Sequence, residues 1–240
     1  MLRIDGLDLT RGARVLLRAL QLQVDVGQRW ALLGRNGAGK STLLRTIAGL
    51  ESMSDKVLLD NAPLPRLGAR ALARCRAYMP AQALDRFGIG VLHAVMLAQP
   101  NPDPDEALRC LDAFDAAALA GRALLQLSAG ERQRVALAQV LAQRAPLLLL
   151  DEPASFQDPA HQTLLARRLG GLRAHALVFA AHDVNWVAGL ATHVLALTDD
   201  GAWVAGVADT VLRAPVLQQV YGCAWQRVPR DGGAALWVPA

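Results

Sequence analysis

The chain has 240 residues, of which 53% are hydrophobic and 19% charged, a composition that fits a folded globular protein and excludes a disordered one. The formal net charge of +4 at pH 7 is too small and too dispersed to argue for nucleic acid or an anionic membrane surface as a partner. The cysteines at positions 75, 110 and 223 form neither a metal-ligand pattern nor a disulfide framework, so we expect a reducing compartment.

The first 28 residues alternate apolar and polar side chains, as half-buried antiparallel strands do. The alternation is clearest in Leu2–Ile4, Leu7–Leu9 and Leu20–Val26. The start of the chain lacks the layout of a signal peptide, and the apolar runs are much shorter than the about 20 residues needed to cross a bilayer. We therefore expect a soluble protein that reaches any membrane through a partner.

A glycine-rich loop follows a short apolar segment, Trp30–Leu33, which is predicted to be a buried strand. The loop fits the pattern G-x-x-x-x-G-K-S, and apolar side chains at helical spacing predict a helix from Ser41 to Leu50. Glycines let backbone N–H groups point at phosphate oxygens, and the helix start adds the positive end of its dipole. We predict that Lys40 reaches the terminal phosphates of ATP and that the Ser41 hydroxyl ligates Mg²⁺. The residues predicted to hold the nucleotide in this loop are Gly34, Arg35, Asn36, Gly37, Ala38, Gly39, Lys40, Ser41 and Thr42.

The pattern becomes helical between residues 85 and 144, where we expect a helical subdomain inserted into the sheet domain. Within it, Ser128 and Glu131 have the S-x-x-E spacing of a capping box that opens a helix. Ala129 and Gly130 are small, so a ligand can approach the helix start closely. The residues alone leave two interpretations open, a second anion site or a plain helix cap.

Two further apolar runs, Leu147–Leu150 and Ala176–Ala181, are predicted to be buried strands. The first ends at Asp151 and Glu152, carboxylates that are costly to bury unless they meet a cation or a reactant. Asp151 suits Mg²⁺ bound through a water, and Glu152 suits a general base that polarises an attacking water. Buried strands that end in polar residues, with helices between them, indicate an α/β fold with a mostly parallel sheet. Its ligand site is expected at the carboxyl ends of the strands. The tail from Gly222 shows no clear period.

The order of these motifs resembles that of the ATP-binding-cassette ATPases over nearly the whole chain. Gly34 to Thr42 is similar to the Walker A motif, Leu147 to Glu152 to Walker B, and Leu127 to Gln133 to the family signature, which usually reads LSGGQ. The resemblance implies one ATPase domain over residues 1–240. Its expected architecture is a phosphate-loop NTPase core of mostly parallel sheet, with an N-terminal antiparallel portion and the inserted helical subdomain.

The resemblance also implies roles for single side chains. Glu152 is the expected catalytic base, and His182 is the expected switch histidine that contacts the γ-phosphate. Asp158 matches the loop that crosses the dimer interface in this family. The aromatic residue that usually stacks on adenine is missing near Arg11, so our hypothesis is that the guanidinium of Arg11 or Arg14 stacks on the base.

The chain departs from the family pattern in two motifs. The signature has Ala129 in place of glycine and Glu131 in place of glutamine, and the glutamate brings a negative charge near the phosphates. The family's Q-loop glutamine usually follows Tyr-Xaa-Pro directly, whereas Gln82 comes one residue later, after Ala81. We expect Gln82 to contact Mg²⁺ through this one-residue shift.

In this family, ATP lies between the Walker A loop of one subunit and the signature helix of its partner. The resemblance therefore implies a head-to-tail homodimer in which Ser128, Gly130 and Glu131 contact the ATP of a second copy. With one cassette, no heptad run and no cysteine pairs, the chain is expected to be the energy-coupling subunit of a membrane transporter. The alternatives are a non-transport cassette protein acting on ribosomes or DNA, and the ATPase of an exporter.

The segment Arg76–Pro80 is similar to that of the importers of vitamin B12, haem and iron siderophores. The closing pattern, from His182–Asn185 through Val211-Leu212 to Val220–Gly222, is also similar to theirs. We therefore expect import of a small substrate, a metal chelate first. The expected partners are transmembrane permease subunits and an extracytoplasmic substrate-binding protein, without nucleic acid. The expected location is the cytoplasmic face of the inner or plasma membrane.

Overall fold

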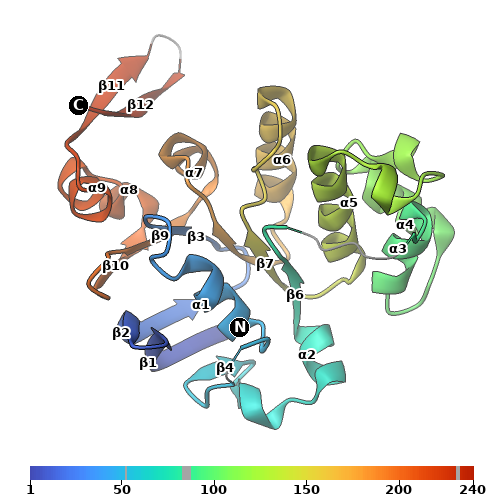
Figure 1. Ribbon diagram of the computed structural model, residues 1–240, viewed down its shortest axis with the longest axis horizontal. Coiled ribbons are helices and arrows are strands. Elements are labelled where there is room, and N and C mark those ends of the chain that lie inside the picture. The colour runs from blue at the N-terminus through green and yellow to red at the C-terminus, as the bar shows by residue number, and fades with distance from the viewer. Residues whose placement is uncertain (52, 83–87, 231–232) are drawn as a thin grey trace.

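The computed structural model describes residues 1–51, 53–82, 88–230 and 233–240. Its centre is a six-stranded sheet in the order β10-β9-β3-β8-β7-β6 (Figure 1). The strands of this sheet are β3 (Arg29–Leu33), β6 (Arg76–Met79), β7 (Leu147–Asp151), β8 (Ala176–Ala180), β9 (His193–Leu197) and β10 (Trp203–Val207). All neighbouring pairs from β9 to β6 are parallel, and β10 pairs antiparallel with β9. The predicted α/β class with a mostly parallel sheet is confirmed.

A second sheet, in the order β2-β1-β4-β5, is formed by residues near the N-terminus. Its strands are β1 (Leu2–Arg11), β2 (Arg14–Val24), β4 (Val57–Leu59) and β5 (Ala62–Pro63). The two short segments predicted before residue 10 are a single strand, β1, whose pairing with β2 shifts in register around Leu7 and Leu9. Such bulges interrupt the alternation of a strand without ending it. The predicted antiparallel portion is confirmed.

Helices cover both faces of the central sheet (Figure 1). They are α1 (Lys40–Ile47), α2 (Ala69–Cys75), α3 (Val91–Ala98), α4 (Pro104–Asp112), α5 (Ala129–Ala142), α6 (Pro159–Gly171), α7 (Val184–Leu190), α8 (Ala208–Val211) and α9 (Ala214–Tyr221), with 3₁₀ turns at Leu64–Arg66, Ala117–Leu119 and Leu124–Gln126. In Figure 1, α3, α4 and α5 gather beyond the β6 edge of the sheet. They lie within the predicted helical stretch, whose first boundary, at residue 85, is outside the described residues.

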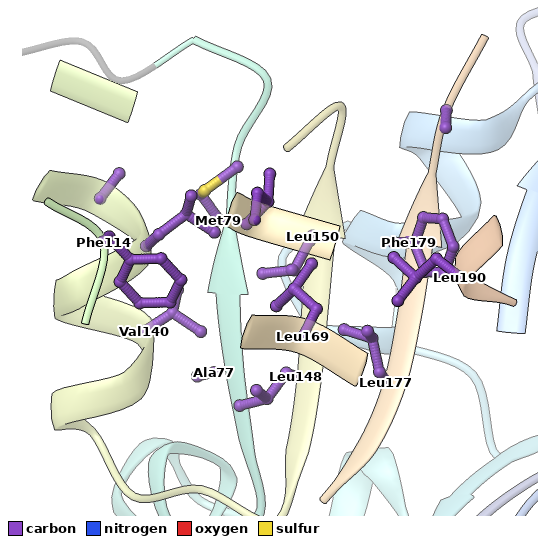
Figure 2. Packing of buried hydrophobic residues seen from close by; sticks show 14 of the residues in the cluster. Ala77, Met79, Phe114, Val140, Leu148, Leu150, Leu169, Leu177, Phe179 and Leu190 are labelled. Atoms are coloured by element: carbon purple, nitrogen blue, oxygen red, sulfur yellow. The ribbon is translucent and has the colours of Figure 1, made fainter. Parts of the chain in front are cut away.

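The run of leucines in β7 contributes to two cores. Leu148 and Leu150 belong to the core shared with α5, α6 and α7, and Figure 2 shows them with Leu169 of α6. Leu147 and Leu149 face the other way, into the core shared with α1 and the antiparallel sheet. Because side chains alternate along a strand and both faces of this sheet are covered, the sequence is continuously apolar instead of alternating.

The tail, for which no element was expected, forms a hairpin of β11 (Trp225–Arg230) and β12 (Gly233–Pro239). Asn185, near the start of α7, holds this hairpin: its Nδ2 donates to Trp237 O at 3.0 Å, and its Oδ1 accepts from Trp237 N at 2.7 Å. The contact spans 52 residues of sequence, so no local pattern announces it. In the parts of the chain that the structure describes, no helix combines the length and hydrophobicity that crossing a bilayer requires.

Candidate active site

The glycine loop joins β3 to α1 at the carboxyl edge of the central sheet. Gly37 and Gly39 have φ angles of +82° and +105°, in the left-handed region that glycine tolerates best. At Gly39, a Cβ would also lie only 3.0 Å from Leu16 Cβ on β2. The loop is therefore closely packed against the antiparallel sheet. A tight glycine turn before a helix can surround an anion with backbone N–H groups.

Lys40 fills the loop from within and is only 5% exposed. Its Nζ donates to Gly34 O at 2.7 Å and to Arg35 O at 3.1 Å. Burial lowers the pKa of Lys40, and the carboxylates of Glu152 and Asp151 oppose that shift. The ammonium group is thus held by main-chain carbonyls at the place where a phosphate would meet it.

Ser41 and Asp151 are brought together although they are 110 residues apart in sequence. The Ser41 hydroxyl donates to Asp151 Oδ1 at 3.0 Å, and Asp151 is 2% exposed at the end of β7. Burial raises the pKa of Asp151, and the hydrogen bond from Ser41 acts against it. A hydroxyl and a carboxylate side by side are oxygen donors of the kind that Mg²⁺ prefers, so these two residues fit such an ion.

Glu152 is held on its main chain and on both carboxylate oxygens. His182 Nε2 donates to Oε1 at 2.5 Å, and the Ser155 hydroxyl donates to Oε2 at 3.1 Å. The backbone has a φ of +53°, a left-handed conformation that costs a non-glycine residue about 1–2 kcal/mol. Its N–H donates to Ala180 O at 3.1 Å, so β7 stays joined to β8 through the strained residue. The carboxylate is an oriented proton acceptor.

A pocket of about 270 Å³ opens over the glycine loop. Loop residues line it together with Glu152 and Arg11, so the structure brings the predicted phosphate-binding and catalytic side chains to one place. Ser128 and Gly130 are not among its lining residues. His182 lines an adjoining pocket of about 170 Å³, which Glu152 also lines.

The predicted capping box at the start of α5 is confirmed. Glu131 N donates to Ser128 Oγ at 3.2 Å, and Ser128 N donates to Glu131 Oε2 at 2.8 Å. Hydrogen bonding from the Ser128 backbone lowers the pKa of Glu131. The other carboxylate oxygen accepts from Arg122 Nη1 at 3.0 Å, which offsets the negative charge expected at this position. The sequence did not reveal the role of Arg122, because Arg122 lies nine residues before Glu131 and outside α5.

Gly130 is required by a close approach of two chain segments. A Cβ at this position would lie 2.8 Å from Phe156 O. We expect Gly130→Ala to lower the free energy of unfolding by about 1–3 kcal/mol, because the added methyl forces the two backbones apart. Urea unfolding followed by circular dichroism measures the change.

The matched control is Gly171→Ala at the end of α6, where an added Cβ meets nothing within 4 Å. That variant should be unchanged or more stable by up to about 1 kcal/mol, since alanine favours a helix. Equal destabilisation of the two variants would contradict the steric explanation for Gly130.

Two other predicted residues lie outside the loop pocket. Gln82 is exposed and lines a different pocket, of about 310 Å³, together with Ala129 and Phe156. Asp158 caps α6, accepting from the N–H of His161 at 2.9 Å. The structure thus places Gln82 beside the start of α5, whereas a metal contact would require it near Ser41.

Comparison with known proteins identifies the family. The family model described as ABC transporter matches residues 17–155. The hemin import ATP-binding protein HmuV of Pseudomonas aeruginosa is 38% identical over 92% of both chains, and that of Burkholderia ambifaria is 36% identical over 100% of both. A solved structure assigned to the metal-chelate type of ABC transporter, in an inward-facing conformation, superposes with a TM-score of 0.84 at 25% identity, covering 100% of this chain and 97% of the other. The chain therefore belongs to the ABC transporter family and is an ATP-hydrolysing subunit of such a transporter.

Proposed function

We propose that this chain energises the import of hemin, or of a closely similar metal chelate, through a transmembrane permease. The observation that carries the proposal is the likeness, over 92% or more of both chains, to proteins named hemin import ATP-binding proteins. The pocket over the glycine loop supplies the matching chemistry, since it combines a buried lysine with an oriented carboxylate. An extracytoplasmic substrate-binding protein would deliver the cargo, and the chain would act on the cytoplasmic face of the membrane.

The proposed roles follow from the contacts. The glycine loop and Lys40 hold the phosphates, and Glu152 accepts a proton from the attacking water while His182 orients its carboxylate. Ser41 and Asp151 would hold Mg²⁺, which when bound neutralises charge on the phosphates. We propose Gln82 as a further ligand, which requires it to leave the pocket that it lines and approach Ser41.

The site is proposed to be completed by a second copy of the chain. The start of α5 offers Ser128, Gly130 and Glu131, but it does not line the loop pocket of its own chain. In a head-to-tail homodimer, the helix start of each copy would face the ATP held by the other, with its N-terminal dipole toward the phosphates. On this proposal residues 1–240 form one ATPase domain, and the helical stretch 85–144 presents α5 to the partner.

Reconstitution tests the function. The chain, its permease and its substrate-binding protein are placed in proteoliposomes, and phosphate release is measured with hemin, cobalamin or a ferric siderophore outside. We expect hemin to stimulate hydrolysis and to accumulate inside in an ATP-dependent way. Stimulation by cobalamin or by a ferric siderophore, without stimulation by hemin, would contradict the proposed cargo, and the absence of any uptake would contradict import.

The adenine contact is tested with Arg11 and Arg14. Arg11 lines the loop pocket, whereas Arg14 Nη2 lies 3.6 Å from Asp199 Oδ1. We expect Arg11→Ala to raise the Kd for ATP by about 2-fold to 30-fold, the effect of losing a guanidinium that stacks on a ring. Arg14→Ala should change the Kd less, and Arg3→Ala, on the far part of β1, should not change it. If neither Arg11→Ala nor Arg14→Ala alters the Kd measured by calorimetry, the stacking hypothesis is wrong.

A further inference from the structure

We propose that Gln133 and Gln157 form a buried bridge that positions Glu152 for catalysis by holding its main-chain carbonyl. The two glutamines are positioning residues, since they act on the reaction only through Glu152. The inference rests on the proposed role of Glu152 as the proton acceptor.

The bridge consists of three hydrogen bonds. Gln133, in the second turn of α5, donates from Nε2 to Glu152 O at 2.6 Å. Its Oε1 accepts from Gln157 Nε2 at 3.2 Å, and the same Nε2 donates to Gly130 O at 2.9 Å. Gln133 is 7% exposed and Gln157 is 9% exposed, so water competes little for these bonds. The amides join the end of β7 to the first turn of α5.

The carbonyl that the bridge holds belongs to a strained residue. Glu152 has a φ of +53°, and Phe156, four residues later, has a φ of +60°. Such backbone conformations persist only where the surroundings determine them. In the described part of the chain, two donors reach Glu152 O, namely Gln133 Nε2 and the N–H of Ser155 at 3.1 Å. Because the main-chain angles set the direction of the side chain, a peptide held at its carbonyl fixes where the carboxylate lies.

The burial of Gln157 is costly and needs an explanation. Among the described residues, no donor reaches Gln157 Oε1, although this atom is buried. A buried acceptor without a partner costs free energy, so an apolar side chain would fill the same space more cheaply. What the amide adds is its two donor contacts, to Gln133 and Gly130. The structure therefore retains Gln157 for orientation and not for packing.

Replacement of the glutamines by methionine tests the bridge, because methionine keeps the length of the side chain and removes the amide. In the full chain assembled with its permease, we expect Gln133→Met to lower kcat for ATP hydrolysis about tenfold to a hundredfold, as a misplaced catalytic group does. The KM for ATP and the Kd for a fluorescent ATP analogue should stay within about twofold, because the glycine loop is untouched. Gln157→Met should lower kcat less, since Gln133 keeps its bond to Glu152. The double variant should match Gln133→Met.

The matched control is Gln139→Met, in the same helix, which loses a bond from Gln139 Nε2 to Ala94 O at 3.1 Å but does not touch Glu152. If the wild type is active and Gln133→Met has the same kcat, the bridge is overturned while the proposed function stands. The same holds if Gln139→Met loses as much kcat as Gln133→Met does. If Gln133→Met does not fold, as judged by thermal unfolding, then Gln157→Met decides, and an unchanged kcat in it overturns the proposal. A wild-type complex that does not hydrolyse ATP overturns the proposed function and the bridge with it.

Discussion

Replacing Glu152 by glutamine is expected to lower kcat for ATP hydrolysis by about 10²-fold to 10⁴-fold, the usual contribution of a general base. The amide keeps the shape of the side chain, so we expect it to stay in contact with Ser155 and His182 and the site to keep its geometry. It cannot accept a proton from water, and ATP should therefore bind without being hydrolysed. Phosphate release by the complex with the permease measures the loss, and equilibrium binding of ATP shows that the pocket is intact.

The control for this variant is Glu106→Gln, since Glu106 pairs with Arg144 at the helical end of the molecule and should leave kcat unchanged. Because the Glu152→Gln chain keeps ATP bound, it should also dimerise with Mg-ATP, as light scattering can show. A kcat close to that of wild type would contradict the role of Glu152. A chain that stays monomeric with Mg-ATP, even beside its permease, would contradict the head-to-tail dimer.

Lys40→Met is expected to raise the Kd for ATP by about tenfold to a hundredfold, because a hydrogen bond to a charged group contributes about 1.5–3 kcal/mol. The ammonium group of Lys40 is buried in the loop and donates hydrogen bonds to Gly34 O and Arg35 O. Methionine fills the same space without charge or donors. Calorimetric titration with Mg-ATP measures the change.

Lys56, the other lysine of the chain, provides the control for Lys40. It is exposed next to β4, and Lys56→Met makes the same change in net charge. That variant should bind ATP like wild type. If the two substitutions weaken ATP binding equally, the effect is one of overall charge, and the specific role of Lys40 is wrong.

Much of the fold follows from local pattern. The short, continuously apolar segments were predicted as strands and form β3, β7 and β8, because burial on both faces of a parallel sheet requires continuous hydrophobicity. The helix after the glycine loop was also predicted, within three residues at each end. The hairpin of β11 and β12 was not predicted, although the dipeptide Asp231-Gly232 between its strands is a local hairpin signal in the sequence. Its attachment to α7 could not be predicted, because the contact of Asn185 with Trp237 joins distant parts of the chain.

The sequence by itself determined the phosphate-binding loop, the identity of the carboxylates that follow β7, and the capping box of α5. Each is encoded within a few consecutive residues, because backbone conformation and helix capping are local properties. Only the tertiary structure decided that Ser41 meets Asp151, that Arg122 offsets Glu131, and that Gln82 lies beside α5. The tertiary structure alone also reveals that the backbone of Glu152 is strained and that Gln133 of α5 donates a hydrogen bond to its carbonyl. These features depend on how α1, α5 and β7 pack together, and packing joins residues that no spacing in the sequence connects.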